Sequence, residues 1–144
     1  MNAIPPESIG RGLTSREKLA LGAEIVGAYA RARWWLWRTD LPTTVSNLRN
    51  TSPRRPGVRA ADQAQAGAKL GRAVGRALRY VPFDSRCLMR SLVLTSVLAR
   101  RGIESSLVIE VQSEPQFAAH ALVEHHGVPL LPPAGPLFRR LLEI

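Results

Sequence analysis

Residues 87–102, with the sequence CLMRSLVLTSVLARRG, decide the fold class. Their apolar positions cover most of a helical circumference, which predicts a buried helix from Cys87 to Arg101 that ends at Gly102. The stretches 106–111 (SLVIEV) and 117–124 (FAAHALVE) then predict two strands. A buried helix followed by consecutive strands favours an α+β fold.

The sequence after residue 124 predicts the rest of a small sheet. Residues 125–127 (HHG) predict a turn, and residues 128–131 predict a third strand. The stretch 132–136 contains three prolines and a glycine, which end that strand. Residues 137–144 predict a short amphipathic closing segment.

The N-terminal part of the sequence predicts helices. Thr14 and Glu17 have the spacing of a capping box, in which a hydroxyl and a carboxylate bind free backbone N–H groups at a helix start. The helix is expected to run to about Arg38, because the proline in residues 40–42 (DLP) disfavours helix before it. Residues 43–50 predict a short turn of helix.

The stretch 51–57 (TSPRRPG) is the best internal boundary, because proline and glycine break regular structure. It divides the chain into an N-terminal helical region, residues 1–57, and a core, residues 58–144. A further helix is expected over residues 61–80. Glycines recur there every four residues beside the apolar face, where they would let another backbone pack closely: Gly67, Gly71 and Gly75.

The composition is that of a globular protein. The 144 residues fit one domain, of which 45% are apolar and 22% charged. Cys87 is the only cysteine, which excludes an intrachain disulfide and a cysteine-based zinc site. Neither a secretory signal nor a membrane-spanning stretch is found, so a soluble cytoplasmic protein is expected. No P-loop pattern and no residue cluster predicts a cofactor or a metal.

The net charge of +9 comes almost entirely from arginine. It would suit a nucleic acid, an anionic membrane surface or an acidic peptide, and by itself it selects none of them. Arginine richness also arises from the base composition of a genome. A basic nucleic-acid binder is one rival function, but it leaves the region of Cys87 and His120 unexplained. Arginine pairs such as Arg100 and Arg101 predict solvated faces.

Cys87 and His120 are the candidate catalytic residues. A helix N-terminus stabilises a thiolate by its partial positive charge, and Cys87 lies in the first turn of a predicted helix. A cysteine nucleophile needs a base within hydrogen-bond distance, and His120 lies in a predicted strand that would hold it rigidly. The alternative is that Cys87 is a small apolar residue of the core.

The motifs around these two residues resemble one family. They are CLMRSLVL at 87–94, LARRGI at 98–103, LVIEV at 107–111 and FAAHALVE at 117–124, followed by Gly127 and Pro129-Leu130. In this order they resemble the transglutaminase-like cysteine peptidase of lasso-peptide biosynthesis, which is the C-terminal part of the B protein. The resemblance covers about residues 80–144. The helical half also resembles the N-terminal region of the standalone version.

The resemblance implies a fold in which a cysteine at a helix N-terminus faces a histidine on an antiparallel sheet. It implies Cys87 as the nucleophile, His120 as the general base, and removal of the leader peptide from a lasso-peptide precursor as the reaction. A separate leader-binding protein would present the precursor in trans, because the N-terminal half lacks a strand-rich recognition module. A separate ATP-dependent cyclase, which would close the macrolactam, is a further expected partner.

The sequence departs from this family at the third catalytic position. Where the family has an aspartate, this sequence has Pro132, whose side chain cannot accept a hydrogen bond. Either Cys87 and His120 act as a dyad, or another group orients the imidazole, or the activity is impaired. Leu122 replaces a usual tryptophan, which a core tolerates.

Glu110 is the candidate substitute for the missing acid. If the first hairpin turns near residues 114–116, Glu110 lies opposite His120, and directly opposed strand residues share a sheet face. A shift of one residue in the register would place its side chain on the other face. Glu124 also lies on the face of His120, but about 13 Å along the strand, so a structural role is expected for it.

Trp34 and Trp37 are the candidate partner-binding residues. Together with Trp35 they are denser than a small core needs, and the consecutive Trp34 and Trp35 cannot both face one stripe of a helix. Packing of the helical region on the core is the structural interpretation. Docking of the leader-bound partner is the functional hypothesis, and contact with a membrane is a further alternative.

These observations predict a cytoplasmic cysteine endopeptidase that removes a leader peptide, without a cofactor and without a nucleic-acid or membrane partner. The alternative is a catalytically weak scaffold that binds the precursor and presents it to the cyclase, which Pro132 favours. The expected architecture is α+β: N-terminal helices and a transglutaminase- or papain-like core, in which the nucleophile-bearing helix packs on a small antiparallel sheet.

Overall fold

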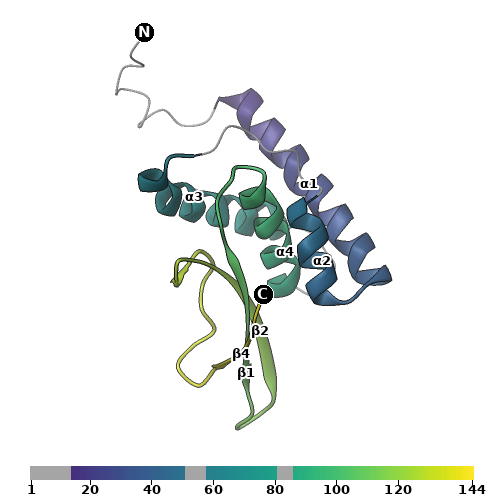
Figure 1. The fold of residues 1–144 in the computed structure, drawn as a ribbon, viewed down its shortest axis with the longest axis vertical. Helices are drawn as coiled ribbons and strands as arrows, with labels where there is room; N and C mark the ends of the chain where they lie inside the picture. Colours follow the sequence, from purple (N-terminus) through teal and green to yellow (C-terminus); the bar gives the residue numbers. More distant parts are fainter. Residues whose placement is uncertain (1–13, 51–57, 81–85) are drawn as a thin grey trace.

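A computed structural model describes residues 14–50, 58–80 and 86–144, which form helices and one antiparallel sheet (Figure 1). The helices are α1 (Ser15–Arg38), α2 (Leu41–Asn50), α3 (Ala60–Leu78) and α4 (Arg86–Ala99). The strands are β1 (Ser106–Gln112), β2 (Ala118–His125), β3 (Val128–Pro129) and β4 (Arg139–Glu143), in the order β3-β2-β1-β4. The α+β fold class is confirmed. No helix in these ranges is long and apolar enough to cross a membrane.

The start of α1 is the predicted capping box. The Thr14 hydroxyl accepts a hydrogen bond from the Glu17 backbone N–H at 3.3 Å, and the Glu17 carboxylate accepts one from the Thr14 backbone N–H at 2.7 Å. These bonds hold the pKa of the Glu17 carboxyl below its ordinary value. The helix runs to Arg38, as predicted.

Helix α2 is longer than the turn predicted over residues 43–50. The Asp40 carboxylate accepts a hydrogen bond from the Thr43 backbone N–H at 2.9 Å, so Asp40 caps a helix that begins at Leu41. Pro42 lies in the first turn, where a backbone N–H has no partner within the helix. The same residues that end α1 therefore also start α2.

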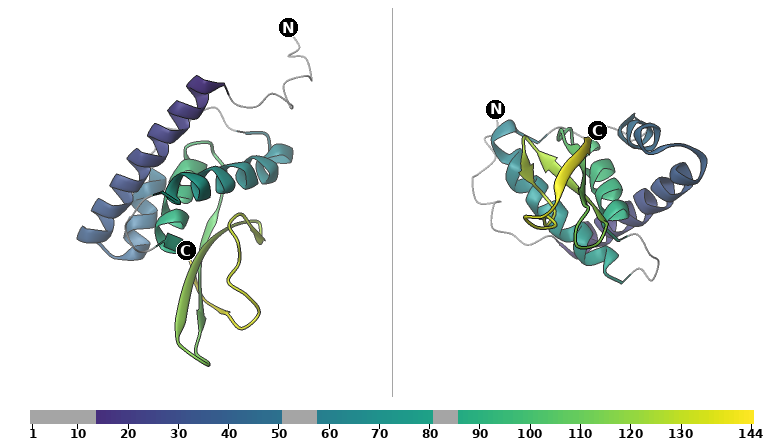
Figure 2. Two further views of the ribbon diagram at one scale, coloured as in Figure 1. Left: turned by 180° about the vertical axis from the view of Figure 1, so that it is seen from behind. Right: turned by 90° about the horizontal axis from the view of Figure 1, so that it is seen from below.

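Helix α4 is the centre of the fold. Its residues from Ser91 to Leu98 are buried, and it contacts α1, α2, α3, β1 and β2. Figure 2 shows the other helices around α4 on one side and the sheet on the other. The left-handed conformation of Gly102 (φ 68°) follows the helix, as expected for a C-terminal glycine. Asp84 and Ser85, whose residue types favour a helix N-cap, precede α4 in the sequence, but they lie outside the described residues.

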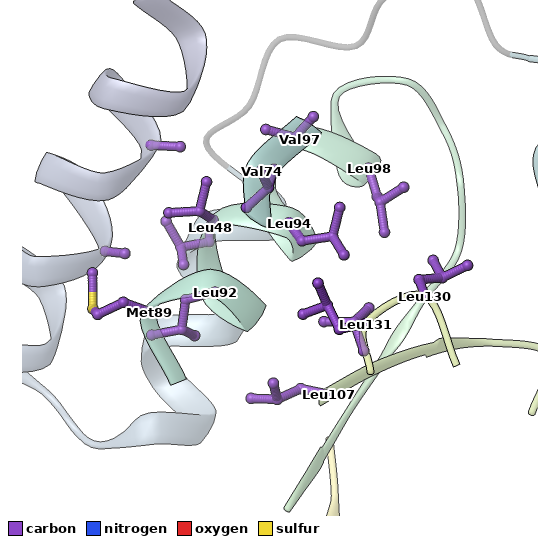
Figure 3. Close-up of a cluster of buried hydrophobic side chains, with 14 of the residues drawn as sticks. Leu48, Val74, Met89, Leu92, Leu94, Val97, Leu98, Leu107, Leu130 and Leu131 are labelled. Atoms are coloured by element: carbon purple, nitrogen blue, oxygen red, sulfur yellow. The ribbon is translucent and has the colours of Figure 1, made fainter. Parts of the chain in front are cut away.

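One apolar cluster joins the helical region to the sheet. It includes Leu48 of α2, Val74 of α3, Leu92 of α4 and Leu107 of β1, all fully buried (Figure 3). Ile25, Ala28 and Ala32 extend it to α1. Burial of this kind is the main favourable term in folding. The division of the chain at residue 57 stays a prediction, because the stretch 51–57 lies outside the described residues.

An ion pair adds to the contact between α1 and α4. The guanidinium of Arg101, just after α4, contacts the buried Glu24 carboxylate of α1 at 2.8 and 3.0 Å. Arg100 lies 3.6 Å from the same carboxylate. The prediction that Arg100 and Arg101 form a solvated face is wrong, because Glu24 draws both guanidinium groups against the helical layer.

The sheet differs from the prediction at both edges. Residues 137–144 were expected as a closing segment, but Arg139–Glu143 form β4 and pair with β1, whose backbone groups would otherwise lack partners at that edge. Strand β3 is shorter than the predicted range 128–131 and ends at Pro129. Leu130 and Leu131 leave the strand and join the buried cluster instead.

The glycines of α3 explain where Leu130 packs. A Cβ atom at Gly71 would clash with the Leu130 carbonyl oxygen, and one at Gly67 would lie 3.0 Å from the Leu130 side chain. Close packing of another backbone is therefore confirmed at Gly71, whereas at Gly67 the close neighbour is the side chain of Leu130. At Gly75 the structure shows no such packing among the described residues, because a Cβ atom added there would meet none of them within 4 Å.

Candidate active site

Cys87 lies at the start of the buried helix. It is the second residue of α4 and is partly buried. Backbone N–H groups in the first turn of a helix have no partner within the helix, and they carry partial positive charge. This position provides donors for an oxyanion formed next to the sulfur.

His120 is held by a backbone carbonyl group. It lies in β2, and its Nε2 atom is 3.0 Å from the carbonyl oxygen of Pro132. A carbonyl oxygen can only accept, so the Nε2–H group of the imidazole donates this bond. In the neutral ring, the lone pair then lies on Nδ1, which is the form that a general base needs. The ring of Phe138 meets the imidazole edge-on, with ring centroids 6.3 Å apart.

Pro132, which stands where the resembling family has an aspartate, contacts His120 through its backbone carbonyl group. The side chain of Pro132 cannot accept a hydrogen bond, but its carbonyl group contacts the same ring that an aspartate would orient. The preceding residues fix this carbonyl: the Leu130 N–H donates to Val123 O at 2.8 Å, and Leu131 is buried. Gly71 admits the Leu130 backbone against α3. An orienting group other than a carboxylate side chain is therefore present.

Cys87 and His120 line one pocket of about 460 Å³, together with Pro132. Its volume is in the usual range for sites that take small ligands or a few residues of a peptide. Within the described part of the chain, no hydrogen bond joins the Cys87 thiol to the imidazole. Catalytic hydrogen bonds often form only when substrate is bound, so two residues that line the same pocket remain candidates for a nucleophile and its base.

Glu110 lies where the register predicts it. It is the direct partner of His120 in the β1–β2 pairing, so both side chains leave the same face of the sheet. Its carboxylate forms no hydrogen bond with any described residue, and Pro132 occupies Nε2 of the imidazole. The register is confirmed, and the catalytic role of Glu110 stays a prediction.

Glu124 has a structural contact. Its buried carboxylate accepts two hydrogen bonds from the Arg140 guanidinium of β4, at 2.8 and 2.9 Å. This contact raises the pKa of Arg140 above its ordinary value. The pair crosses from β2 to β4 over the central strand β1, so it helps to hold the last strand in place.

A comparison with families of known proteins decides the family. The model of the transglutaminase-like superfamily matches residues 26–142, which include Cys87, His120 and most of both halves of the chain. The chain belongs to the transglutaminase-like superfamily. This superfamily includes cysteine peptidases, so a cysteine nucleophile at a helix start with a histidine on the adjacent sheet is the expected site. No curated protein and no solved structure matches the chain significantly.

The transglutaminase-like pocket also contains arginines that were not singled out from the sequence. Arg72, Arg76 and Arg79 come from α3 and the residue after it, and Arg90 comes from α4. The spacing of the first three places them on one helix face beside the glycines, and this pattern could have indicated them. In the described ranges, no three histidine, cysteine or acidic side chains gather as a metal site would need.

A larger hollow of about 660 Å³ lies between α2, the end of α4 and the sheet. Arg49, Glu104, His126 and Glu143 line it, and no cysteine does. Arg49 donates from there to the carbonyl oxygens of Ser105 and Ile144, at 2.7 and 3.0 Å, and burial lowers its pKa. Its lining contains no cysteine, whereas the smaller pocket contains Cys87 and His120, so the smaller pocket is the candidate active site.

The tryptophans of α1 divide between the core and the surface. Trp35 packs against the buried cluster, whereas Trp34 and Trp37 are 47% and 80% exposed. The guanidinium of Arg38 lies over both exposed rings, 4.8 Å from the centre of Trp34 and 5.7 Å from that of Trp37. The packing interpretation therefore holds for Trp35, and Trp34 and Trp37 remain candidates for partner binding.

Proposed function

We propose that this chain is a cysteine endopeptidase that removes the leader peptide from a lasso-peptide precursor in the cytoplasm. The observation that carries the peptidase part is the contact of the Pro132 carbonyl with His120, in the pocket that also contains Cys87. This contact selects the tautomer of a general base beside a cysteine at a helix start. The resemblance of residues 80–144 to the lasso-peptide peptidases supports the substrate.

The first chemical step forms a thioester. His120 Nδ1 takes the proton of the Cys87 thiol, and the thiolate attacks the carbonyl carbon of the scissile peptide bond. Backbone N–H groups at the start of α4 stabilise the oxyanion of the tetrahedral intermediate. The C–N bond then breaks, the imidazolium gives its proton to the leaving amine, and the leader remains attached to Cys87 as an acyl-enzyme.

The second step releases the leader. His120 Nδ1 takes a proton from a water molecule, which attacks the thioester carbonyl. Collapse of the second tetrahedral intermediate breaks the C–S bond, and the imidazolium returns the proton to the thiolate. The Pro132 carbonyl keeps the ring in place through both steps and stabilises the imidazolium by accepting from Nε2–H.

Glu110 is a second positioning residue in this proposal. Its carboxylate and the imidazole leave the same sheet face from directly paired residues. A negative charge so placed favours the imidazolium that forms in each step. Cys87 and His120 remain the essential pair, and Glu110 acts through His120.

The partners follow from the same proposal. A leader-binding protein presents the precursor in trans, and an ATP-dependent cyclase closes the macrolactam after cleavage. Trp34 and Trp37 are proposed as the docking site for the leader-bound partner, because both rings are exposed on α1. Aromatic rings and arginines are enriched at such interfaces.

The scaffold function remains the second candidate. It is favoured by the absence of a hydrogen bond between Cys87 and His120 among the described residues, and by the lack of a carboxylate at Pro132. A scaffold would bind the precursor and raise cyclisation without cleaving it. Turnover therefore separates the two functions.

The experiment uses the full chain with the precursor peptide encoded beside its gene, with and without the leader-binding protein. Mass spectrometry should detect free leader, and its rate of formation should rise when the leader-binding protein raises the local substrate concentration. Replacing Trp34 and Trp37 by alanine should lower the stimulated rate more than the basal rate. Intact precursor after prolonged incubation, with normal cyclisation when the cyclase is supplied, would favour the scaffold.

A further inference from the structure

The pocket of Cys87 is lined on one side by arginine side chains. Arg72, Arg76 and Arg79 recur at intervals of four and three residues, so they lie along one face of α3 and its C-terminal end. Arg90, three residues after Cys87 in α4, adds a fourth guanidinium to the same pocket. These residues have no role in the steps of thioester formation and hydrolysis.

No acidic side chain balances this charge within the part of the chain that the structure describes. Neither aspartate nor glutamate lines the pocket, and none of its arginines forms an ion pair with a described residue. The Nε–H group of Arg90 is buried and has no acceptor there. Other arginines of the chain do have partners: Arg101 contacts Glu24, and Arg140 contacts Glu124.

Like charges gathered without a counter-charge from the described residues favour an anionic ligand. A guanidinium binds a carboxylate through two parallel hydrogen bonds, which is the strongest neutralising contact that a peptide can offer. The pocket is also lined by the apolar residues Leu130, Leu131 and Ala121. The lining thus combines basic and apolar side chains, as a site for an extended acidic peptide would require.

The glycines of α3 leave room for such a peptide. At Gly71 the Leu130 carbonyl group fills the place of a side chain, but at Gly75 no described residue lies within 4 Å of an ideal Cβ position. Gly75 also lines the pocket, between Arg72 and Arg79. Because Gly75 has no side chain, the surface of α3 is recessed at this point, with Arg72, Arg76 and Arg79 nearby on the same helix.

Building on the proposed peptidase, we propose that this pocket selects precursor segments that carry carboxylate side chains close to the scissile bond. Arg72, Arg76, Arg79 and Arg90 are the specificity-determining residues. They bind the acidic side chains while the thiolate of Cys87 attacks the backbone between or beside them. Binding of an acidic peptide would explain why these four arginines lie in the pocket of Cys87, so a nucleic-acid ligand is not needed to explain them.

The first test measures the charge at the pocket without any cleavage. Cys87 is the only cysteine, so alkylation of the protein reports on this site alone. The ratio of the alkylation rates with iodoacetate, an anion, and iodoacetamide, which is neutral, cancels the fraction of ionised thiol. We expect Arg76→Gln to lower this ratio about threefold, and Arg76→Gln with Arg79→Gln to lower it further. High salt should have the same effect.

The matched control is Arg16→Gln, which removes one exposed arginine from the first turn of α1. It should leave the ratio unchanged. A ratio that does not respond to the pocket variants or to salt, or that falls equally with Arg16→Gln, would overturn the proposal. Circular dichroism on each variant ensures that only folded proteins are compared.

The second test uses peptides. Hexaglutamate should slow the reaction of Cys87 with iodoacetamide, hexaglutamine should not, and the protection should be lost in the Arg76→Gln, Arg79→Gln variant. Equal protection by both peptides, or by neither, would overturn the proposal. Peptide binding is measured here whether or not the chain hydrolyses a peptide bond.

The third test separates this proposal from the peptidase itself. Precursors with the acidic residues near the cleavage site changed to their amides should be cleaved at least about threefold more slowly by the unmodified chain. Equal rates would overturn the charge selection while the peptidase stands. If no precursor is cleaved, the peptidase proposal fails, and protection by hexaglutamate still decides whether the pocket binds acidic peptides.

Discussion

The carbonyl oxygen of Pro132 lies 3.0 Å from Nε2 of His120. Although the Pro132 side chain cannot accept a hydrogen bond, its main-chain carbonyl group accepts one from this imidazole. The imidazole is oriented by the backbone, and the contact is insensitive to the identity of the side chain at position 132 as long as the path of the chain is kept.

Pro132→Ala should therefore preserve cleavage, because alanine retains the carbonyl group. We expect a rate within about threefold of the unmodified chain, whereas His120→Ala should lower it at least about a hundredfold. Rates of leader release measured by mass spectrometry at equal folded concentration compare the two. Equal losses in both variants would contradict orientation by the carbonyl.

Glu110→Gln should slow cleavage far less than His120→Ala but more than Glu124→Gln, after correction for the folded fraction. Glutamine keeps the size of the side chain and removes the charge that favours the imidazolium. Because the role is electrostatic, the pH profile of leader release should shift in Glu110→Gln and not in Glu124→Gln. In the Glu110→Gln variant, the additional change Pro132→Asp should restore part of the lost cleavage rate, because it places a carboxylate beside the imidazole of His120. Identical pH profiles in both glutamate variants would exclude Glu110 as a positioning residue.

Gly71→Ala should lower both stability and activity. A Cβ atom there meets the Leu130 carbonyl oxygen, and overpacking against a backbone costs about 2 kcal/mol. The displaced Leu130 backbone would also shift the Pro132 carbonyl away from His120. The matched control is Gly22→Ala in α1, where nothing lies within 4 Å of the added Cβ and a gain of about 0.5–1 kcal/mol is expected. Urea unfolding measures both, and a neutral Gly71→Ala would contradict the close packing.

Glu24→Ala should destabilise the chain by about 3 kcal/mol, because it leaves Arg101 without its main counter-charge at a mostly buried position. Glu143→Ala removes one partner of an exposed pair and should cost less than about 1 kcal/mol. Thermal unfolding followed at α-helical and at tryptophan signals gives both values. Because the ion pair joins α1 to the residue that follows α4, the unfolding temperatures from the two signals should decrease together. Separate transitions would show that α1 unfolds independently of the rest of the chain.

Much of the fold was predictable because it is encoded locally. The capping box at Thr14 and the apolar circumference of α4 each depend on residues a few positions apart. The pairing of Glu110 with His120 follows from the position of one hairpin turn. These features need no knowledge of distant contacts, so pattern and spacing suffice.

The remaining features depend on contacts between distant segments. Strand β4 forms because β1 offers an open edge, and the apolar pattern of its own residues is too weak to predict a strand. The acceptor for His120 is a carbonyl group, which every residue has, so no residue type signals it. The arginines of α3 could not be assigned to the site from the sequence, because only the packing of α3 against α4 places them in the same pocket as Cys87.

In the proposed reaction, Cys87 attacks the scissile bond with His120 as its base. The most direct measurement is the intact mass of the protein, acid-quenched shortly after mixing with precursor and leader-binding protein. We predict a population of protein that is heavier by the mass of the leader less one water, with the adduct on the peptide that contains Cys87. In Cys87→Ala, both this adduct and the release of the leader should be lost. Leader release by Cys87→Ala at the rate of the unmodified chain would contradict it.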